Sequence, residues 1–207
     1  MKLKILALIL ARKHSKRLPK KNLKKIGKKT LIELSIDSAK NIKGIVDILV
    51  STDDKKILRI AKKNGVLSPW LRPRHLSYDH TSSEDSALHA LNWYEKNISK
   101  IDGLLLLQPT TPFRSKKLLK KAIKIFEKNK NKPIVSVSKI LNKQKFKKPV
   151  VNGAFYLTSP EKFRKYKNFS KKNFYPIFIK KKKECIDINT KEDLKIARSF
   201  NTFNVIR

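Results

Sequence analysis

The residues of this chain best suited to chemistry on a charged substrate form a basic cluster near its N-terminus. Several cationic donors beside a strand end can neutralise a polyphosphate, which offers many acceptor oxygens. The chain contains 42 Lys, so a cluster of this kind also arises by chance, and its charge alone leaves both explanations open. The cluster comprises Arg12, Lys13, Lys16, Arg17, Lys20 and Lys21.

Polar segments follow other predicted strands as well. They span residues 51–54, 108–114 and 187–189 and offer carboxylate, amide and hydroxyl groups. In a doubly wound α/β sheet, ligands bind outside the carboxyl ends of the strands. These segments and the basic cluster therefore predict one site at one edge of such a sheet. Asp54 is the exception, because its position favours capping of the next helix.

The hydrophobic pattern predicts the elements that position these segments. An unbroken apolar run over residues 5–11 is typical of a central strand covered on both faces. Strands and helices then alternate, which favours an α/β fold with a mostly parallel central sheet. The predicted strands span 5–11, 46–50, 104–107, 134–138, 153–157 and 175–179, and the helices span 31–41, 55–64, 83–98, 115–128 and a last one that begins at Thr190, with Asp193 completing its capping box.

The composition limits the class of protein. The 207 residues carry 51 Lys and Arg against 16 Asp and Glu, a formal net charge of +35. This excess suggests nucleic acid or an anionic membrane, but sequence-specific readers of nucleic acid favour Arg, and only nine are present. The single Cys185 excludes an internal disulfide, and no apolar run reaches the ~20 residues of a membrane span. We therefore expect a cytoplasmic protein without a membrane partner.

Several short motifs occur in the order found in one enzyme family. Arg12 and the segment Ser15-Lys16-Arg17-Leu18-Pro19-Lys20-Lys21-Asn22 resemble the nucleotide-binding signature of the acylneuraminate cytidylyltransferases, the CMP-N-acetylneuraminic acid (CMP-sialic acid) synthetases. Matching segments continue in register over nearly the whole chain, and together they are specific for this family. They are 50–54, 71–73, Asp79 with 81–83, 89–91, 107–114, 135–137, 152–156 and 186–194.

The resemblance implies a Rossmann-like, GT-A-like nucleotidyltransferase fold of three layers, with residues 1–207 as a single cytidylyltransferase domain. It also implies a reaction in which CTP and a nonulosonic acid, a nine-carbon 2-keto acid sugar, give the CMP-sugar and pyrophosphate. The anomeric hydroxyl would attack the α-phosphorus in line. Such a transfer depends on positioning and on charge neutralisation by cations and Mg²⁺. CTP and the acid sugar are therefore the expected partners, and Mg²⁺ is the expected cofactor.

The resemblance also assigns roles to individual residues. It implies that Lys21, Arg12 and Asp187 are catalytic and that Asp187 and Asn189 serve the metal. Gln108 and Asn152 would orient the sugar, and Arg114 would close the loop around it. The nucleotide-binding set comprises Arg12, Ser15, Lys16 and Lys21 at the triphosphate, Asn22 on the nucleotide, and Arg72, Thr81 and Ser83 along the cytidine.

Three departures from the family pattern bear on these roles. Lys13 and His14 stand where a pair of glycines is usual, which reduces the conformational freedom of the backbone beside the phosphates. Asn189 replaces the second Asp of the usual Asp-x-Asp motif, which should weaken Mg²⁺ binding. The segment around 139–152 is shorter than the usual arm that supports dimerisation and reaches the sugar site. A homodimer, a monomer and a changed sugar preference are all compatible with that shortening.

Other functions are also compatible with the sequence. Within the same fold, the chain could act on another acid sugar such as the eight-carbon Kdo, use another base, or be a weakly active relative. From a different class, a basic nucleic-acid-binding protein would bind strands with a steep salt dependence. That class does not explain why polar segments follow the strands, so we expect no specific nucleic acid as a partner. His89 and Trp93, four residues apart, are expected to pack rather than bind a metal.

Overall fold

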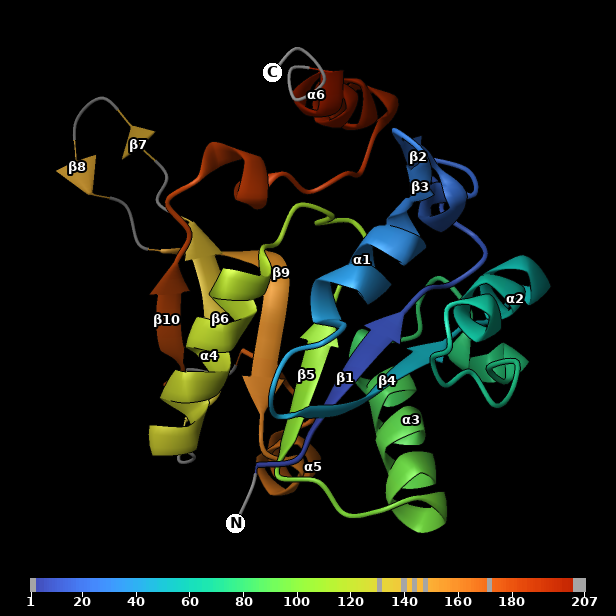
Figure 1. The fold of residues 1–207 in the computed structure, drawn as a ribbon, viewed down its shortest axis with the longest axis vertical. Coiled ribbons are helices and arrows are strands. Elements are labelled where there is room, and N and C mark those ends of the chain that lie inside the picture. Colours follow the sequence, from blue (N-terminus) through green and yellow to red (C-terminus); the bar gives the residue numbers. More distant parts are fainter. Residues whose placement is uncertain are drawn as a thin grey trace.

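The computed structural model describes residues 3–129, 132–138, 141–142, 145–146, 149–170 and 173–202. Its centre is a six-stranded sheet with the order β10-β6-β9-β5-β1-β4 (Figure 1). Strand β1 pairs in parallel with β4 and β5, β10 pairs in parallel with β6, and β9 runs antiparallel between β5 and β6. The strands are β1 (Ile5–Leu10), β4 (Ile45–Ser51), β5 (Gly103–Leu107), β6 (Ile134–Ser138), β9 (Val150–Thr158) and β10 (Tyr175–Phe178).

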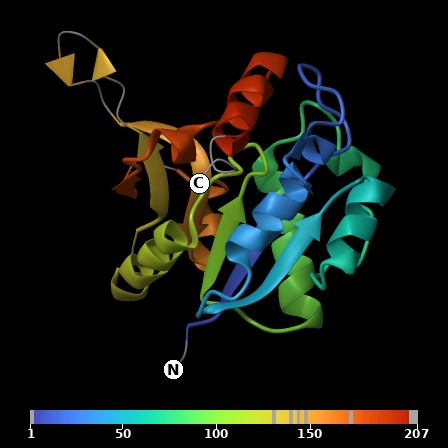
Figure 2. The same cartoon turned by 45° about the horizontal axis from the view of Figure 1, so that its top comes forward.

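Helices cover both faces of this sheet, which gives the expected α/β fold of three layers (Figure 2). One face packs against α1 (Leu31–Ala39), α2 (Lys55–Lys63) and α4 (Lys116–Lys128). The other face packs against α3 (Ser83–Asn97) and α5 (Pro160–Tyr166). Each predicted helix is present, with ends that differ by one or two residues.

The central strand β1 shows why its sequence lacks alternation. Ile5, Ala7 and Ile9 pack into the core cluster under α1 and α4, whereas Leu6 and Leu8 pack into the cluster under α3. All five side chains are fully buried. Successive side chains of a strand point to opposite faces, so a strand covered on both faces needs apolar residues throughout.

A third, smaller apolar cluster joins the C-terminal helix to the N-terminal part of the chain. The hairpin of β2 (Lys25–Ile26) and β3 (Lys29–Thr30) contacts α6 (Lys191–Thr202), the red helix of Figures 1 and 2. Leu18, Ile26 and Leu31 pack there against Ile188 and Leu194. The capping box predicted at the start of α6 is confirmed by hydrogen bonds in both directions between Thr190 and Asp193.

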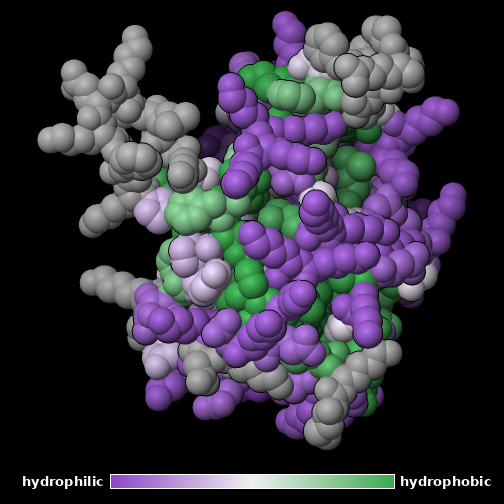
Figure 3. Space-filling model, turned by 60° about the vertical axis from the view of Figure 1, so that its left-hand side comes forward, coloured by the Kyte–Doolittle hydropathy of each residue, from purple (hydrophilic) through white to green (hydrophobic). Residues whose placement is uncertain are grey.

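The surface is dominated by charged side chains. Figure 3 shows hydrophilic residues over much of one face, with hydrophobic side chains visible between them. Large apolar residues that remain exposed include Val150, Tyr175 and Phe178, all on β9 and β10. In the part of the chain that the structure describes, no helix is long and apolar enough to cross a membrane.

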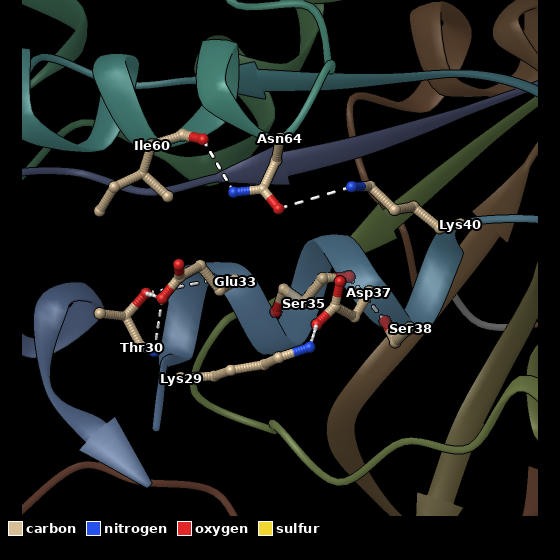
Figure 4. Close-up of polar contacts among 9 residues, drawn as sticks. All are labelled: Lys29, Thr30, Glu33, Ser35, Asp37, Ser38, Lys40, Ile60 and Asn64. Atoms are coloured by element: carbon tan, nitrogen blue, oxygen red, sulfur yellow. Dashed lines mark hydrogen bonds and ion pairs between the residues drawn. The ribbon is translucent and has the colours of Figure 1, made fainter. Parts of the chain in front are cut away.

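Helix α1 begins and ends at defined polar contacts (Figure 4). Thr30 Oγ1 accepts from the backbone N–H of Glu33, and Glu33 Oε2 accepts from that of Thr30, which completes a capping box. The helix ends at Ala39 rather than at residue 41 as predicted. Lys40 has an extended backbone and Asn41 a φ of 59°, so neither continues the helix.

The segment between β6 and β9 departs from expectation in one respect. Strand β9 starts at Val150 rather than 153, because Val150 and Val151 pair with Ser138 and Val137 of β6. Within the predicted insertion, β7 (Leu141–Asn142) and β8 (Lys145–Phe146) form a two-stranded antiparallel pair. The remaining residues of that prediction, 139–140, 143–144 and 147–148, lie outside the described residues.

Candidate functional site

A cavity of about 420 Å³ opens near the carboxyl ends of β1 and β5. The loop after β1, the segment 72–86, the loop after β5 and the segment before α6 all contribute to its wall. This is the edge of the sheet where a doubly wound fold binds ligands. Of the site residues predicted from the sequence, the cavity brings together Arg12, Lys21, Asn22, Arg72, Thr81, Ser83, Gln108, Asp187 and Asn189.

One wall of the cavity is basic. It carries Arg12, Arg17 and Lys21, all from the loop after β1. Partial burial lowers the pKa of Lys21; Asp187 raises that pKa, and Arg17 and Arg12 lower it further. Three cations at one wall provide the charge-assisted donors that a polyphosphate requires. The predicted function of the basic cluster thus has a matching geometry, although only part of the cluster faces the cavity.

Ser15 and Lys16 do not line the cavity, and their expected contact with the triphosphate stays a prediction. Leu18 is buried in the third apolar cluster, and the turn before it lies at the surface. The Lys16 side chain is 79% exposed, and its Nζ lies 3.2 Å from Asp79 Oδ2. Arg12 Nη1 lies 2.9 Å from the other oxygen of the same carboxylate. Asp79 therefore links Lys16 to the rim of the site through Arg12.

The loop after β1 is closed by its own side chains. Asn22 is buried, and its Nδ2 donates to the backbone oxygen of Arg12 at 2.9 Å. The backbone N–H of Lys13 donates to Asp53 Oδ1 at 2.7 Å, which ties the loop to the end of β4. Lys13 and His14 are exposed and do not line the cavity, so this loop accommodates side chains where glycines are usual.

The acidic side of the cavity comes from residues 187–189. Ile188 is fully buried, and its backbone N–H donates to the Thr110 oxygen at 2.8 Å. This anchor places Asp187 and Asn189, one on each side of it, in the cavity wall. Asn189 Nδ2 donates to Asp187 Oδ2 at 2.7 Å. The backbone N–H of Asn189 donates to Asp193 Oδ2 at 2.9 Å, so the cap of α6 also holds this segment.

A third wall is formed by the segment before α3 and the start of that helix. Arg72 is buried, donating from Nη1 to Ser86 Oγ at 2.9 Å and from Nη2 to the Ser51 oxygen at 3.2 Å. Among the described residues its Nε has no hydrogen-bond partner. Thr81 Oγ1 donates to the His75 oxygen at 2.9 Å, and Ser83 begins α3. The wall thus offers a fixed cationic donor beside hydroxyl groups.

Gln108 lines the cavity at the end of β5, and Gly153 of β9 lies directly behind it. A Cβ atom at position 153 would lie 2.5 Å from Gln108 Oε1, and the φ of Gly153 is +73°. The positive φ favours glycine here, and a Cβ atom at this position would force the Gln108 amide to move. Asn152 does not line the cavity: its Oδ1 accepts from the backbone N–H of Ala154 at 3.2 Å. Of the two residues predicted to orient the sugar, only Gln108 lines the cavity.

Arg114 does not line the cavity, although the sequence predicted that it closes the loop around the sugar. Its guanidinium is buried and donates to protein acceptors from α1, from its own loop and from β9. Burial lowers its pKa to about 9. Its donors are already used within the protein, including two acceptors of its own loop, so its predicted role at the sugar stays a prediction. The acceptors are the backbone oxygens of Ala154 and Gln108 and the hydroxyls of Ser35, Ser38 and Thr111.

The oxygen atoms of the acidic side fit Mg²⁺ only in part. No group of three or more His, Cys, Asp or Glu that could hold a metal occurs among the described residues. Mg²⁺ in nucleotide enzymes is commonly held by one or two carboxylates together with substrate phosphates and waters. The Asp187 carboxylate in the cavity wall meets this requirement. Asn189 Oδ1 instead accepts from Lys21 Nζ at 3.1 Å and from Arg17 Nη2 at 3.3 Å.

Two expectations about neighbouring residues are confirmed. Asp54 caps α2, accepting at Oδ1 from the backbone N–H of Lys56 at 2.6 Å. His89 packs against Trp70 with ring centroids 5.2 Å apart, and Trp70 packs in turn on Trp93.

Some cavity residues were not assigned from the sequence. Arg17 was counted only as part of the basic cluster, and Asp79 only as part of a matching motif. No periodicity or spacing distinguishes their side chains from those of neighbours that point away. The unassigned lining residues include Arg17, Tyr78, Asp79, Ser82 and Ser86.

Comparison with known families and proteins identifies similar chains. A family model described as "Cytidylyltransferase" matches residues 6–194. The CMP-N,N'-diacetyllegionaminic acid synthase of Legionella pneumophila is 29% identical over 228 residues, which cover 98% of each chain. The pseudaminic acid cytidylyltransferase of Campylobacter jejuni is 35% identical over 156 residues, which cover 75% of this chain and 64% of that protein.

A solved structure supports the fold. The structure of a CMP:2-keto-3-deoxy-manno-octonic acid synthetase complexed with CTP superposes with a TM-score of 0.75. The match covers 97% of this chain and 99% of the other, at 15% identity. At that identity the likeness concerns the fold, which is the Rossmann-like nucleotidyltransferase fold expected from the sequence.

Proposed function

Because this chain belongs to the cytidylyltransferase family, we propose that it transfers cytidine monophosphate from CTP to a nonulosonic acid. Membership confirms the family resemblance seen in the sequence and makes the chain a nucleotidyltransferase. The observation that carries the proposal is the cavity itself. It joins three basic side chains, Arg12, Arg17 and Lys21, to a carboxylate at Asp187 and an amide at Gln108.

In the proposed reaction the anomeric hydroxyl of the sugar gives up its proton to solvent as its oxygen bonds to the α-phosphorus. The bond between the α-phosphorus and the oxygen that bridges to the β-phosphorus breaks. Pyrophosphate leaves with the negative charge that develops on that oxygen. Lys21 and Arg12 at the basic wall neutralise this charge, which is the main contribution a protein makes to phosphoryl transfer. The cytidine lies along Arg72, whose buried guanidinium is held rigidly. Gln108 then orients the sugar on the side of β5.

We further propose Mg²⁺ as the cofactor, held by Asp187 together with phosphate oxygens of the nucleotide. When bound, the ion supplies additional neutralisation of charge on the transferring phosphate. The carboxylate in the cavity wall supports this proposal. Asn189 is less suited to the role, because its oxygen already accepts from two cationic side chains.

We also propose that the protein is cytoplasmic and forms a homodimer. CTP as substrate and a single cysteine are consistent with a cytoplasmic enzyme. Two exposed apolar side chains of the edge strand β10, Tyr175 and Phe178, support a homodimer through that edge. Size-exclusion chromatography with light scattering tests the dimer: a mass of one chain at micromolar concentration contradicts it.

The experiment that tests the proposed function measures pyrophosphate release. The purified chain is incubated with Mg²⁺, CTP and N-acetylneuraminic, legionaminic or pseudaminic acid. Release that requires both CTP and one of these sugars is expected, and none with any of them would overturn the proposal. Kdo and the other nucleoside triphosphates are assayed in parallel to define specificity. Lys21→Ala is expected to lower kcat by a factor on the order of 100 or more, because it removes a preorganised positive charge.

A further inference from the structure

Arg17 belongs to the basic wall of the cavity, but the proposed reaction gives it no individual role beside Lys21 and Arg12. Its Nη2 donates to Asn189 Oδ1 at 3.3 Å, and Lys21 Nζ donates to the same oxygen at 3.1 Å. Asn189 Nδ2 donates in turn to Asp187 Oδ2 at 2.7 Å. The amide thus joins two cations at its oxygen to one carboxylate at its nitrogen.

We propose that Arg17 and Lys21 act together as a cation pair that binds the pyrophosphate portion of the nucleotide. Asn189 is the positioning residue of this pair and not a ligand of the metal. This proposal deepens the proposed function and rests on it. It adds Arg17 as a nucleotide-binding residue and places the metal on Asp187 without Asn189.

The surroundings of Asn189 support a fixed position for its amide. Its backbone N–H donates to Asp193 Oδ2 at 2.9 Å within the cap of α6. The preceding Ile188 is fully buried and bonded to the Thr110 backbone. Because the backbone of Asn189 and the residue before it are both held, the amide oxygen is presented to the basic wall at a constant place. Two long, flexible cationic side chains are thereby brought to one point.

The chemistry of an amide explains why this arrangement leaves the cations available. A neutral carbonyl oxygen accepts hydrogen bonds from Arg17 and Lys21 without cancelling their charge. A carboxylate at position 189 would form ion pairs with both and compete with an incoming phosphate. Positive neighbours, Arg17 and Arg12, also lower the pKa of Lys21, so an arriving polyanion relieves repulsion within the basic wall.

The same geometry opposes a metal at this oxygen. A carbonyl oxygen has two lone pairs, and both are occupied by the two donors. A divalent cation would have to displace Arg17 and Lys21 and then lie next to their charges. Asp187 carries a negative charge at the same side of the cavity and is the better ligand.

The test measures binding by isothermal titration calorimetry, with inorganic tripolyphosphate and with CTP, in EDTA and again in Mg²⁺. Four variants are compared with the unaltered chain: Arg17→Ala, Arg17→Lys, Asn189→Ala and, as a matched control, Arg59→Ala. Arg59 is an exposed arginine of α2 outside the cavity, so its removal costs the same formal charge. Arg17 is also exposed, so replacing either arginine should not impair folding. Circular dichroism checks this.

In EDTA, Arg17→Ala is expected to weaken tripolyphosphate binding about tenfold, the effect of losing one charge-assisted hydrogen bond. Arg17→Lys should recover part of this loss, and Arg59→Ala should change the affinity less than about twofold. Asn189→Ala is expected to weaken metal-free binding about fivefold through the loss of positioning. A fifth variant combines Asn189→Ala with Arg17→Ala. Its affinity for tripolyphosphate should fall by less than the product of the two single effects, because the residues act as a unit.

Three results would overturn the proposal. The first is an unaltered chain that does not bind tripolyphosphate, and the second is an effect of Arg17→Ala no larger than that of Arg59→Ala. The third is an Asn189→Ala variant with unchanged binding in EDTA and weakened binding only in Mg²⁺, which would make Asn189 a metal ligand. Tripolyphosphate carries neither base nor sugar. Failure of CTP-dependent pyrophosphate release therefore contradicts the proposed function, whereas these results concern the cation pair alone.

Discussion

Lys21 must satisfy two opposing requirements at the level of a single residue. In the proposed reaction it carries a positive charge that neutralises the leaving group, yet it is partly buried beside other cations. Burial and the nearby Arg17 and Arg12 lower its pKa, and Asp187 compensates only in part. The same features that aim the ammonium group at the cavity therefore bring its titration closer to neutral pH.

These opposing effects on the pKa of Lys21 predict how kcat/KM declines at alkaline pH. The value of kcat/KM reports ionisations of the free enzyme, so it should fall with rising pH at a pKa below the ordinary lysine value of 10.5. Lys21→Arg should shift this limb to higher pH, because a guanidinium stays protonated. Between the lowered pKa and 10.5, Lys21 binds more protons in the unfolded chain than in the folded chain. The free energy that Lys21 costs the folded state therefore decreases as the pH rises through this range. An unchanged limb in Lys21→Arg would assign it to another group.

Gly153 allows a second prediction at this scale, with a control already present in the chain. Gly153→Ala should displace Gln108, raising KM for the acid sugar severalfold while CTP affinity changes little. Gly65→Ala tests backbone strain alone, because Gly65 has a similar φ of +68° and nothing within 4 Å of an added Cβ. Each variant should lose about 1 kcal/mol of unfolding free energy from the left-handed backbone. An equal KM for the sugar in both variants would contradict the proposal that Gly153 leaves room for the Gln108 side chain.

At the level of elements, Arg114 holds three parts of the fold in register. Its guanidinium joins α1, the loop after β5 and β9 by donating to backbone oxygens and a serine hydroxyl. The sequence correctly indicated that this arginine matters to the loop. It could not show that the donors point inward, because the acceptors come from segments up to 79 residues away.

Arg114→Met should therefore act on stability before it acts on chemistry. The substitution keeps the buried volume similar but removes the guanidinium that donates to the carbonyl groups of Gln108 and Ala154 and to three hydroxyls, so we expect a loss of about 3 kcal/mol or more in unfolding free energy. Arg114→Lys should recover little, because an ammonium cannot span the same set of acceptors. Urea unfolding measures both. A normal unfolding midpoint with a raised sugar KM would instead place the guanidinium on the substrate.

The sheet shows how far sequence patterns predict the elements. Runs of mostly apolar residues were sufficient to predict the strands β1, β5 and β6, because these strands are covered on both faces. The start of β9 was missed, since Val150 and Val151 are recruited only by pairing with β6. The β2–β3 hairpin was missed as well: its strands have two residues each and are stabilised by contact with α6. Tertiary pairing, rather than local propensity, determines both.

At the scale of the whole molecule, the charge of +35 has two opposite consequences. Like charges over the surface repel one another and destabilise the folded chain, whereas the charges at the basic wall favour an anionic substrate. Raising NaCl from about 50 to about 500 mM shortens the Debye length and should screen both. We expect the melting temperature to rise by about 3 °C while CTP affinity falls.

Scanning fluorimetry and calorimetry at each salt concentration check this pair of trends. Choline chloride at equal ionic strength should reproduce them, because screening does not depend on the cation. A melting temperature that falls with salt would mean that attractive ion pairs outweigh the repulsion.

The candidate site as a whole was predictable in outline and not in detail. The order of the motifs located Lys21, Arg72, Gln108 and Asp187 correctly in one cavity. Which members of the basic cluster face that cavity depends on the burial of Leu18, a contact with residues from the far end of the chain. Side-chain direction at such positions follows from the assembled fold and leaves no pattern in the sequence.

The contact between the loop after β1 and the segment before α6 also has a consequence for how the protein is made. Arg17 and Asn189 are 172 residues apart along the chain. During synthesis the basic loop leaves the ribosome early, and its partner emerges only after the whole sheet has been translated. The basic loop and the segment before α6 can therefore form their shared wall only at the end of translation.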